Sequence, residues 1–305
     1  MTSPAAPYGY PPAPQQPAAQ PQFASQVPVE QTTLGHALRS EWTKIRTVRS
    51  TMWTLGVMML LVVGIDLLVV VPISHDDDPS TPVLAAGLFG LMLGQVAVLT
   101  LGVLVITSEY GTGMIRTTFT ACPQRGRVLT AKAAVFFGLS FATTTVACTI
   151  TALISNAVVG GREVPSYYGN GTAGDMAGVV VRNGRTAASG SEWLGATVGV
   201  GLYVALLGLL ALAVGTLLRH SAGAITSMIG VVLLPLIVAL FLPSGLESTR
   251  NTLIRYSAPN ALASLYHIPM IGDGDQNGVR QLVILAIITA VALAGAFAAI
   301  SNRDV

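Results

Sequence analysis

The chain has 305 residues, of which 52% are hydrophobic and only 10% are charged. Its mean hydropathy is +0.65, whereas soluble domains usually have about 25% charged residues. This composition excludes an ordinary soluble enzyme and indicates a protein with several membrane spans. The formal net charge of +2 is too small and too scattered to indicate nucleic acid as a partner.

The first 32 residues differ in composition from the rest of the chain. They hold eight of the 17 prolines, mixed with alanine and glutamine, and no lysine or arginine. Without a basic start or an apolar run, this segment lacks the pattern of a signal peptide. We expect a disordered cytoplasmic tail over 1–32, either a solvated extension or a docking segment, and one membrane domain over 33–305.

Six segments are apolar and long enough to cross a bilayer, for which a helix needs about 20 residues. Only Arg219, His220 and Ser221 separate the fourth from the fifth, so a tight turn makes these two spans antiparallel neighbours. The predicted fold class is an all-α integral membrane protein. The predicted spans are Thr51–Ile73, Val83–Thr107, Ala133–Val159, Trp193–Leu218, Ala222–Leu242 and Leu282–Ile300.

Basic residues predict the orientation of the spans. Four precede the first span within Arg39–Arg49, and four more lie between the second and third spans within Arg116–Lys132. The short loop after the first span has three aspartates, Asp76–Asp78, and no lysine or arginine. Because short cytoplasmic loops are enriched in basic residues, we expect both termini to be cytoplasmic, in a multi-pass protein of the cell (plasma) membrane.

The segment Leu34–Arg49 has the periodicity of an amphipathic helix. A basic helix of this kind lies in the membrane interface, where lipid head groups bind its cations, or simply anchors the first span. Glu41 falls within the apolar arc, so its carboxylate needs a partner, either Lys44 or a basic residue of another element. The apolar face comprises Leu34, Leu38, Trp42, Ile45, Val48 and Met52.

The segment Ser108–Lys132 connects the second and third spans. Gly113 marks the end of the second span, and Pro123 ends any helix that follows it. Only about two helical turns therefore fit over Met114–Ala121. The spacing is equally compatible with a short helix that a soluble partner pushes and with an ordinary cytoplasmic loop. Met114, Ile115 and Phe119 are available for docking, whereas Arg125, Arg127 and Lys132 are expected to face an anionic inner leaflet.

The two longer loops on the outer side differ from each other. Gly160–Glu192 holds many glycines and little apolar periodicity, so we expect a mobile loop. Ser244–Val279 has apolar residues interspersed with Pro259 and Pro269. This composition favours one or two short helices that lie on, or dip into, the outer leaflet.

Several polar residues fall inside the predicted spans. A carboxylate at the centre of a membrane helix costs about 2.5–3.5 kcal/mol on insertion scales, so Asp66 is a candidate for the transport pathway or is simply paired. Gln95 is a weaker candidate of the same kind. Thr145, Thr149 and Asn156 share one face of the third span, where they line a pathway or, as we favour, join helices by hydrogen bonds.

Small residues recur every four positions in two spans, which permits close approach of helix backbones. They are Ala86, Gly90 and Gly94 in the second span, and Ala286, Ala290, Ala294 and Ala298 in the last. The sequence does not decide whether these contacts lie within one chain or between two.

Two stretches carry a resemblance to a known family. SEWTKIRTVRS at Ser40–Ser50 and EYGTGMIRTTFTACPQRGRVLTAK at Glu109–Lys132 resemble the N-terminal region and first cytoplasmic loop of type-2 ATP-binding cassette (ABC) exporter permeases of the actinobacterial type. The layout of six spans with a sizeable outer loop before the last also fits that family. The tail and the glycine-rich loop are not part of the pattern.

The resemblance implies a role for each stretch. Leu34–Arg49 would be the interfacial connecting helix, with Glu41 and Trp42 near the ATPase. Gly113–Ala121 would be the coupling helix, seated in a groove of the nucleotide-binding subunit. Glu109 and Arg116 would flank that contact, Phe119 would be part of it, and the outer helices of Ser244–Val279 would close the pathway.

The chain has no GxxxxGK[ST] phosphate-binding loop, so we expect no cofactor in it. The resemblance implies that a separate ABC ATPase subunit binds ATP and Mg²⁺, and that the permease works with a second permease chain, identical or related. Membrane lipids are the other expected partner.

The alternatives are an ion-coupled secondary transporter that uses Asp66, a membrane enzyme, and a structural anchor or assembly factor. A secondary transporter would usually show internal repeats, and we find none. The sequence has neither HExxH nor GxSxG. The four dispersed histidines have no metal-ligand spacing, and Cys122 and Cys148 are not expected to pair or to bind a metal.

Overall fold

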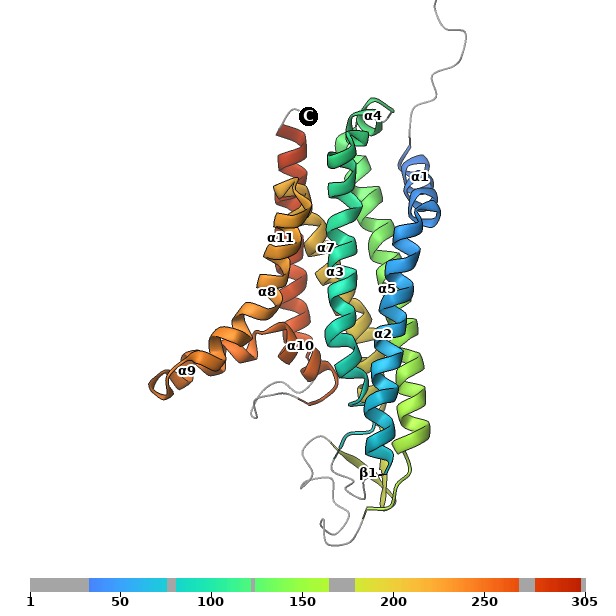
Figure 1. The fold of residues 1–305 in the computed structure, drawn as a ribbon, viewed down its shortest axis with the longest axis vertical. Helices are drawn as coiled ribbons and strands as arrows, with labels where there is room; N and C mark the ends of the chain where they lie inside the picture. Colours follow the sequence, from blue (N-terminus) through green and yellow to red (C-terminus); the bar gives the residue numbers. More distant parts are fainter. Residues whose placement is uncertain (1–32, 76–80, 122–123, 165–178, 269–277, 303–305) are drawn as a thin grey trace, which may run out of the picture. The chain divides into compact units, whose positions relative to one another are not determined.

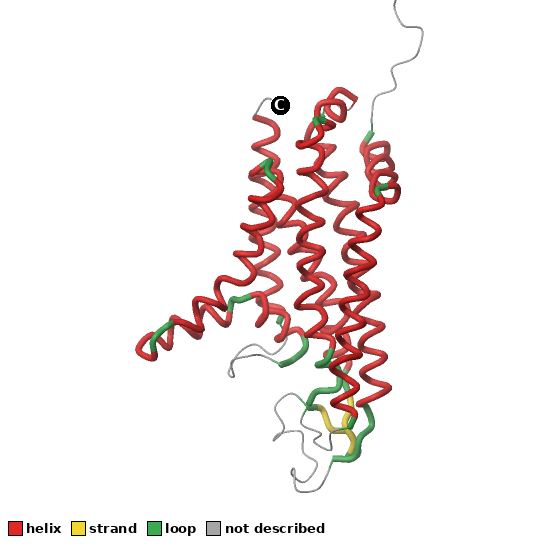
Figure 2. The backbone as a smooth tube through the Cα atoms, in the orientation of Figure 1, coloured by secondary structure: helices red, strands yellow, loops and turns green. Residues whose placement is uncertain are grey.

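The computed structural model describes residues 33–75, 81–121, 124–164, 179–268 and 278–302. The predicted tail at 1–32, the aspartates Asp76–Asp78 and Cys122 lie outside these residues, so those predictions stay untested. Residues 33–305 form one compact unit, within which the described residues build an almost entirely helical fold (Figure 2).

Long helices make up most of this unit (Figure 1). The helices before the β-hairpin are α1 (Leu34–Thr47), α2 (Arg49–Ser74), α3 (Gly87–Thr112), α4 (Met114–Ala121) and α5 (Arg125–Val159). A hairpin of β1 (Val180–Arg182) and β2 (Arg185–Ala187) follows. The chain continues as α6 (Gly190–Leu194), a π-helical turn (Gly195–Gly199), α7 (Val200–Leu218), α8 (Ser221–Phe241), a 3-10 turn (Ser244–Leu246), α9 (Glu247–Arg255), α10 (Ala258–Leu265) and α11 (Val279–Asn302).

The prediction of an all-α membrane protein is confirmed. Six described helical segments are long and apolar enough to cross a membrane, and they match the six predicted spans. The third span is longer than predicted, because α5 begins at Arg125 rather than at Ala133. The predicted turn between the fourth and fifth spans is confirmed, since α7 ends at Leu218 and α8 begins at Ser221.

The second and fourth spans form the centre of the bundle. They bury more than half of their apolar stretch, whereas the other four bury less than a third. The predicted small residues explain part of this packing: a Cβ on Gly90 would collide with the backbone of Val62, so α3 lies directly against α2 within one chain. In α11, Ala290, Ala294 and Ala298 are exposed, so they do not pack within this chain, and a contact between two chains stays a prediction.

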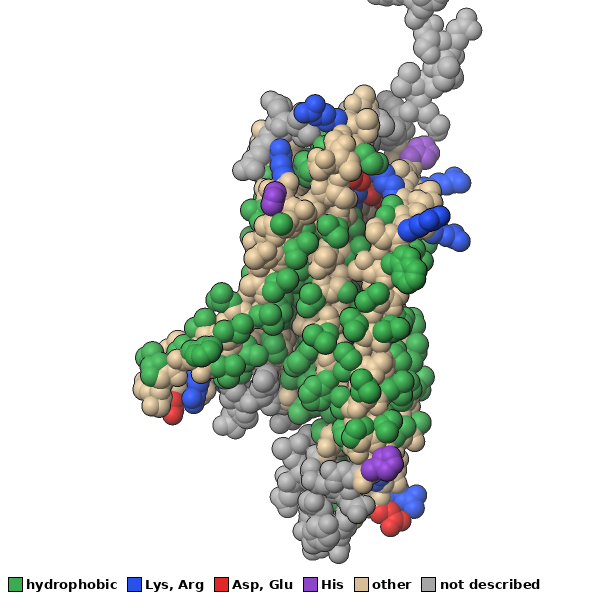
Figure 3. Space-filling view, viewed as in Figure 1, with side chains coloured by type: hydrophobic (Ala, Val, Ile, Leu, Met, Phe, Trp, Pro, Cys, Tyr) green, Lys and Arg blue, Asp and Glu red, His purple; other side chains and the backbone are tan. Residues whose placement is uncertain are grey.

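The two ends of the bundle carry different elements (Figure 1). We call the end that holds α1, α4 and the last turn of α11 the α4 end; the hairpin and α9–α10 lie at the opposite end. Hydrophobic side chains cover the middle of the visible face, and charged side chains gather near both ends (Figure 3).

Two segments predicted to lie on the outer side correct earlier expectations of their structure. Part of the loop predicted to be mobile is ordered, because β1 pairs with β2 and α6 begins at Gly190. One or two short helices were expected within Ser244–Val279, and two are present, α9 and α10. All eight residues of α10 are buried, however, so this helix packs inside the protein rather than on a leaflet.

Candidate functional site at the α4 end

A break at one residue separates the amphipathic helix from the first span. The side chain of Thr33 caps the start of α1, and Val48 is extended, with its N–H bonded to the carbonyl of Lys44. The predicted apolar face is mostly exposed: Trp42 is 49% exposed and only Ile45 is buried. Glu41 is buried beside Ile45, so α1 turns a carboxylate toward the bundle.

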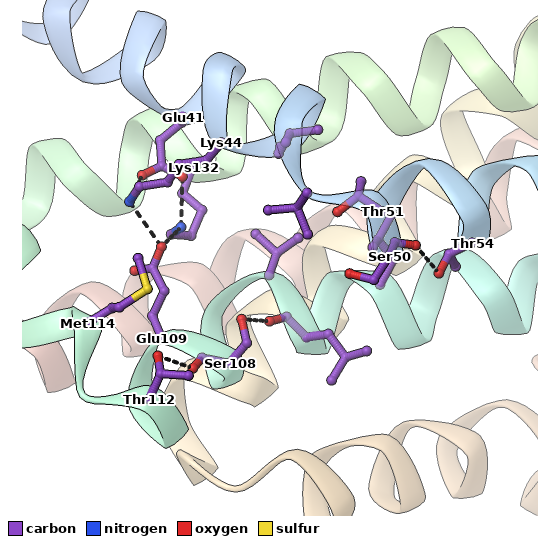
Figure 4. A pocket seen from close by; sticks show the side chains of 15 residues that line it. Glu41, Lys44, Ser50, Thr51, Thr54, Ser108, Glu109, Thr112, Met114 and Lys132 are labelled. Carbon is purple, nitrogen blue, oxygen red and sulfur yellow. Dashed lines mark hydrogen bonds and ion pairs between the residues drawn. The ribbon is translucent and has the colours of Figure 1, made fainter.

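Two carboxylates and two ammonium groups meet where α1, α3 and α5 come together (Figure 4). Lys132 Nζ lies 2.7 Å from Glu41 Oε2 and 2.8 Å from Glu109 Oε1. Lys44 Nζ lies 3.0 Å from Glu41 Oε1 and 3.1 Å from Glu109 Oε1. We call these four residues the ion cluster. Glu41 thus has both kinds of partner that its position predicts: Lys44 of the same helix and Lys132 of another helix.

Lys132 corrects the sequence analysis. It was expected to face the lipid head groups, but it is 1% exposed and is one of the largest fully buried side chains. A buried charge is very costly unless it is paired, and removing one partner of a buried pair costs about 3–5 kcal/mol. The ion cluster therefore holds α1 against α3 and α5, three elements far apart in sequence.

Lys44 is the more exposed cation of the cluster. Burial alone would lower its pKa, but the nearby carboxylates of Glu41 and Glu109 outweigh burial and raise the pKa above its ordinary value of 10.5. Lys44 therefore carries its charge throughout the physiological pH range. Its contacts with two helices depend on that charge.

The short helix α4 begins directly after α3. Gly113 has a left-handed conformation, with φ of 73°, which glycine adopts at little cost. Ile115 is buried in the core. The Arg125 guanidinium lies 5.5 Å from the centre of the Phe119 ring, and its Nη1 donates to the carbonyl of Ile300 in α11 over 3.3 Å. Residues from α4, α5 and α11 are thus connected.

This arrangement corrects the expected docking face of α4. Ile115 is not available to a partner, and Phe119 is half-buried against its own chain. The exposed residues of this helix are Met114, Arg116, Thr117 and Thr120.

A second contact holds the last turn of α3 from the other side. The Arg219 guanidinium lies 5.2 Å from the centre of the Tyr110 ring. Arg219 is the first of the two residues between α7 and α8, and it has a positive φ of 53°. Glu109 and Tyr110 are adjacent, so neighbouring residues of α3 contact elements on two sides of that helix.

No protein-family model matches the chain, and no curated protein matches it. The assignment of a function therefore depends on the residues and their geometry.

The candidate pathway residues differ in burial and in hydrogen-bond partners. Asp66 is fully buried, and Ser155 of α5 donates to its Oδ1 over 3.1 Å. Gln95 is buried, and its Nε2 donates to the carbonyl of Met92 in the same helix. Asn156 is exposed on the surface of the bundle, so its role stays a prediction.

The two threonines of that group lie at helix contacts, but among the described residues neither hydroxyl makes a hydrogen bond to another helix. Thr145 lies against Gly201 of α7, where a Cβ would overlap its hydroxyl. Thr149 donates to the backbone carbonyl of Thr145 over 2.7 Å. Both therefore serve contacts within or between helices. Among the described residues, no group of three or more His, Cys, Asp or Glu side chains is placed to hold a metal ion.

Sequence reasoning missed four residues that make these contacts. Lys132 carried a usable signal, since it stands four residues before the buried Phe136 and thus on the same helix face. Ser155 shares a face with the buried Thr151 in the same way. Tyr110 and Arg219 lie at helix ends, where the sequence gives no indication of which side chains meet.

Proposed function

We propose that the chain is the transmembrane subunit of an ABC exporter, which moves a substrate across the cell membrane with ATP hydrolysed by a separate subunit. The observation that carries the proposal is the position of α4. One face of this helix is exposed at the end of the bundle, and the other is attached to the core through Ile115 and to α5 through Phe119. The resemblance of residues 40–50 and 109–132 to exporter permeases supports the same assignment.

The contacts at the α4 end give a route by which a push on α4 reaches the spans. Gly113 joins α4 to α3, and the Phe119–Arg125 contact joins it to the start of α5. Arg125 in turn bonds to the end of α11. The ion cluster adds α1, because Glu41 shares Lys132 with Glu109. Movement of α4 therefore tilts several spans together.

The proposal also fixes an orientation. Arg46, Arg49 and Arg116 are exposed at or near the α4 end, as the positive-inside rule expects of a cytoplasmic side. The start of α1 and the end of α11 lie at this same end (Figure 1). In the proposed assembly the partner ATPase docks here and binds ATP and Mg²⁺, and a second permease chain, identical or related, completes the transporter.

One observation favours a second candidate, an ion-coupled secondary transporter. Asp66 is a fully buried carboxylate, and among the described residues its Oδ2 has no hydrogen-bond partner. Such a group is a natural site for a coupled proton or cation. This candidate needs no ATPase and gives no role to the exposed face of α4.

Affinity purification from the native membrane, followed by mass spectrometry, tests the first proposal. We expect a stoichiometric partner that contains GxxxxGK[ST]. Arg116→Glu reverses a charge on the exposed face of α4 and should reduce recovery of that partner about tenfold or more. The matched control is Arg280→Glu, at an exposed arginine near the opposite end.

The outcomes separate the two candidates. If the partner is recovered equally with Arg116→Glu, docking on α4 is wrong. If no ATPase is recovered in several mild detergents, the exporter proposal fails and the Asp66 carrier becomes the better explanation. In that case Asp66→Asn should abolish transport driven by an ion gradient in proteoliposomes.

A further inference from the structure

A groove of about 390 Å³ lies beside the ion cluster, between the α1–α2 junction and α3 (Figure 4). Its walls are mainly apolar. Five hydroxyl-bearing residues also line it, and the hydroxyls of Thr54, Ser108 and Thr112 each donate to a backbone carbonyl of their own helix. The apolar wall residues are Ile45, Val48, Leu101, Leu104, Val105 and Met114.

One end of the groove has an unused hydrogen-bond acceptor. Glu109 lines the groove, and its side chain is only 8% exposed. Oε1 of this carboxylate accepts from both lysines, whereas Oε2 is buried and has no partner among the described residues. A buried carboxylate oxygen without a donor costs free energy. This end of the groove therefore favours a ligand that donates a hydrogen bond.

The charges beside this oxygen select the kind of donor. Two carboxylates already balance two ammonium groups, and Lys132 Nζ is 2.8 Å from the other oxygen of Glu109. A third ammonium group would be repelled by these lysines. Lys44 Nζ, which has three N–H groups, makes two hydrogen bonds within the described chain, to Glu41 and Glu109. A hydroxyl fits both groups, since it donates to Glu109 and accepts from Lys44.

The surroundings of the groove indicate that its ligand comes from the membrane. Trp42 and Trp53 are exposed on the two sides of the α1–α2 junction, and exposed tryptophans prefer the depth of lipid head groups. The junction residues Val48, Ser50 and Thr51 line the groove itself. A molecule whose polar head lies at this depth and whose apolar body extends along α3 matches both ends of the groove.

We propose that this groove binds a neutral amphiphile with an aliphatic body and a hydroxyl-bearing head group. The hydroxyl bonds to Glu109 Oε2 and Lys44 Nζ, and the aliphatic body lies against Leu101 and Leu104. The site requires neither the ATPase nor the proposed export activity, so its test is independent of the partner purification.

Photolabelling of the full-length chain in nanodiscs of phosphatidylcholine, which has no hydroxyl group, tests the proposal. The probe is monoolein with a diazirine in its acyl chain, and labelled peptides are mapped by mass spectrometry. We expect labels within residues 45–54 and 101–112. Unlabelled monoolein should compete about tenfold better than methyl oleate, which lacks the donor, and better than the cationic oleylamine.

A matched pair of variants locates the site. Ser108→Phe fills the groove without removing a member of the ion cluster, and should reduce labelling at least about tenfold. The control is Ser227→Phe on α8, because Ser227 is also exposed and bonds to the carbonyl four residues before it, as Ser108 does. Size-exclusion chromatography checks that both variants are folded, and the ligand comparison in the unmodified chain does not depend on either variant.

Three results would overturn the proposal. They are equal labelling of Ser108→Phe and the unmodified chain, equal competition by methyl oleate and monoolein, and stronger competition by oleylamine. The amount of the amphiphile in cells that carry Ser108→Phe shows where it comes from. A resident bilayer lipid keeps its cellular abundance in these cells, whereas an exported compound accumulates. Either result supports the site.

Discussion

Among the described residues, two of the places where the chain buries carboxylates have surroundings that differ in kind. At the α4 end, Glu41 and Glu109 are matched by Lys44 and Lys132, and three helices supply the four groups. Deeper in the bundle, Asp66 of α2 has only the hydroxyl of Ser155 as a described hydrogen-bond partner. The ion cluster is therefore a charge-balanced contact between helices, whereas Asp66 has no counterion among the described residues.

This contrast suggests different uses for similar side chains. In the ion cluster, loss of one charge leaves an opposite charge buried and unpaired, so the joint resists change. At Asp66, substitution by a neutral side chain such as asparagine keeps the bond to Ser155 and removes a costly buried charge. The fold should therefore tolerate loss of this charge.

Lys132→Met should have the largest effect on stability. The substitution leaves Glu109 with only the partly exposed Lys44 and should lower the free energy of unfolding by about 3–5 kcal/mol. Thermal denaturation in detergent measures the loss. Lys44→Met should cost clearly less, because the Lys44 side chain is 30% exposed. An equal loss for both variants would contradict the central position of Lys132.

A charge exchange sharpens the same point. Glu41→Lys and Lys132→Glu should each destabilise the protein, whereas the double variant restores the attraction across α1 and α5. A double-mutant cycle should give a coupling free energy of about 1–3 kcal/mol. Purely additive effects would show that the two groups, 2.7 Å apart, do not interact energetically.

Arg125→Gln should have an intermediate effect. It removes the contact with Phe119 and the bond to Ile300, which together are worth about 1–2 kcal/mol. If Arg125 transmits movement of α4, transport should fall further than this loss of stability explains. Arg280→Gln is the matched control, and equal behaviour of the two variants would remove Arg125 from the route.

Asp66→Asn should change the free energy of unfolding by less than about 1 kcal/mol, because the bond to Ser155 survives and no counterion is left behind. Chemical denaturation of Asp66→Asn and Lys132→Met under the same conditions compares their free energies of unfolding directly. A loss as large as that of Lys132→Met would mean that Asp66 is also a structural joint.

The dependence of stability on pH should show the smallest effect. Lys44 has a raised pKa in the folded chain, so its contribution is complete below pH 10.5 and is lost as the pH rises through the higher folded-state value. Melting temperatures of the unmodified chain should therefore fall more steeply above pH 10.5 than those of Lys44→Gln. Parallel curves would contradict the raised pKa.

Much of the fold could be predicted from local patterns. The spans and the turn at Arg219 follow from apolar runs and short breaks, and α4 follows from Gly113 and Pro123. The need of Glu41 for a cation was also evident from its place in an apolar arc. Periodicity of one helix describes that helix alone, however, and it cannot say which other helix lies opposite.

The long-range pairs were therefore beyond sequence reasoning. Lys132 was assigned to the lipid head groups because basic residues near a span end usually lie there, and only the approach of α1 shows why it is buried. The packing of α10 was missed for a similar reason. Its alanines and serine suit either a leaflet or a helical bundle, and the surrounding helices decide between them.

The ion cluster also bears on how the chain is assembled. Glu41 and Lys132 are 91 residues apart, so at about 5–20 residues per second the ribosome makes the carboxylate roughly 5–20 seconds before its ammonium partner. Throughout that interval α1 has no buried cation to dock against on α5. Among the described helices, α1 thus reaches its final position only after the start of α5 has been synthesised, and a chain that stops before Lys132 is made lacks that cation altogether.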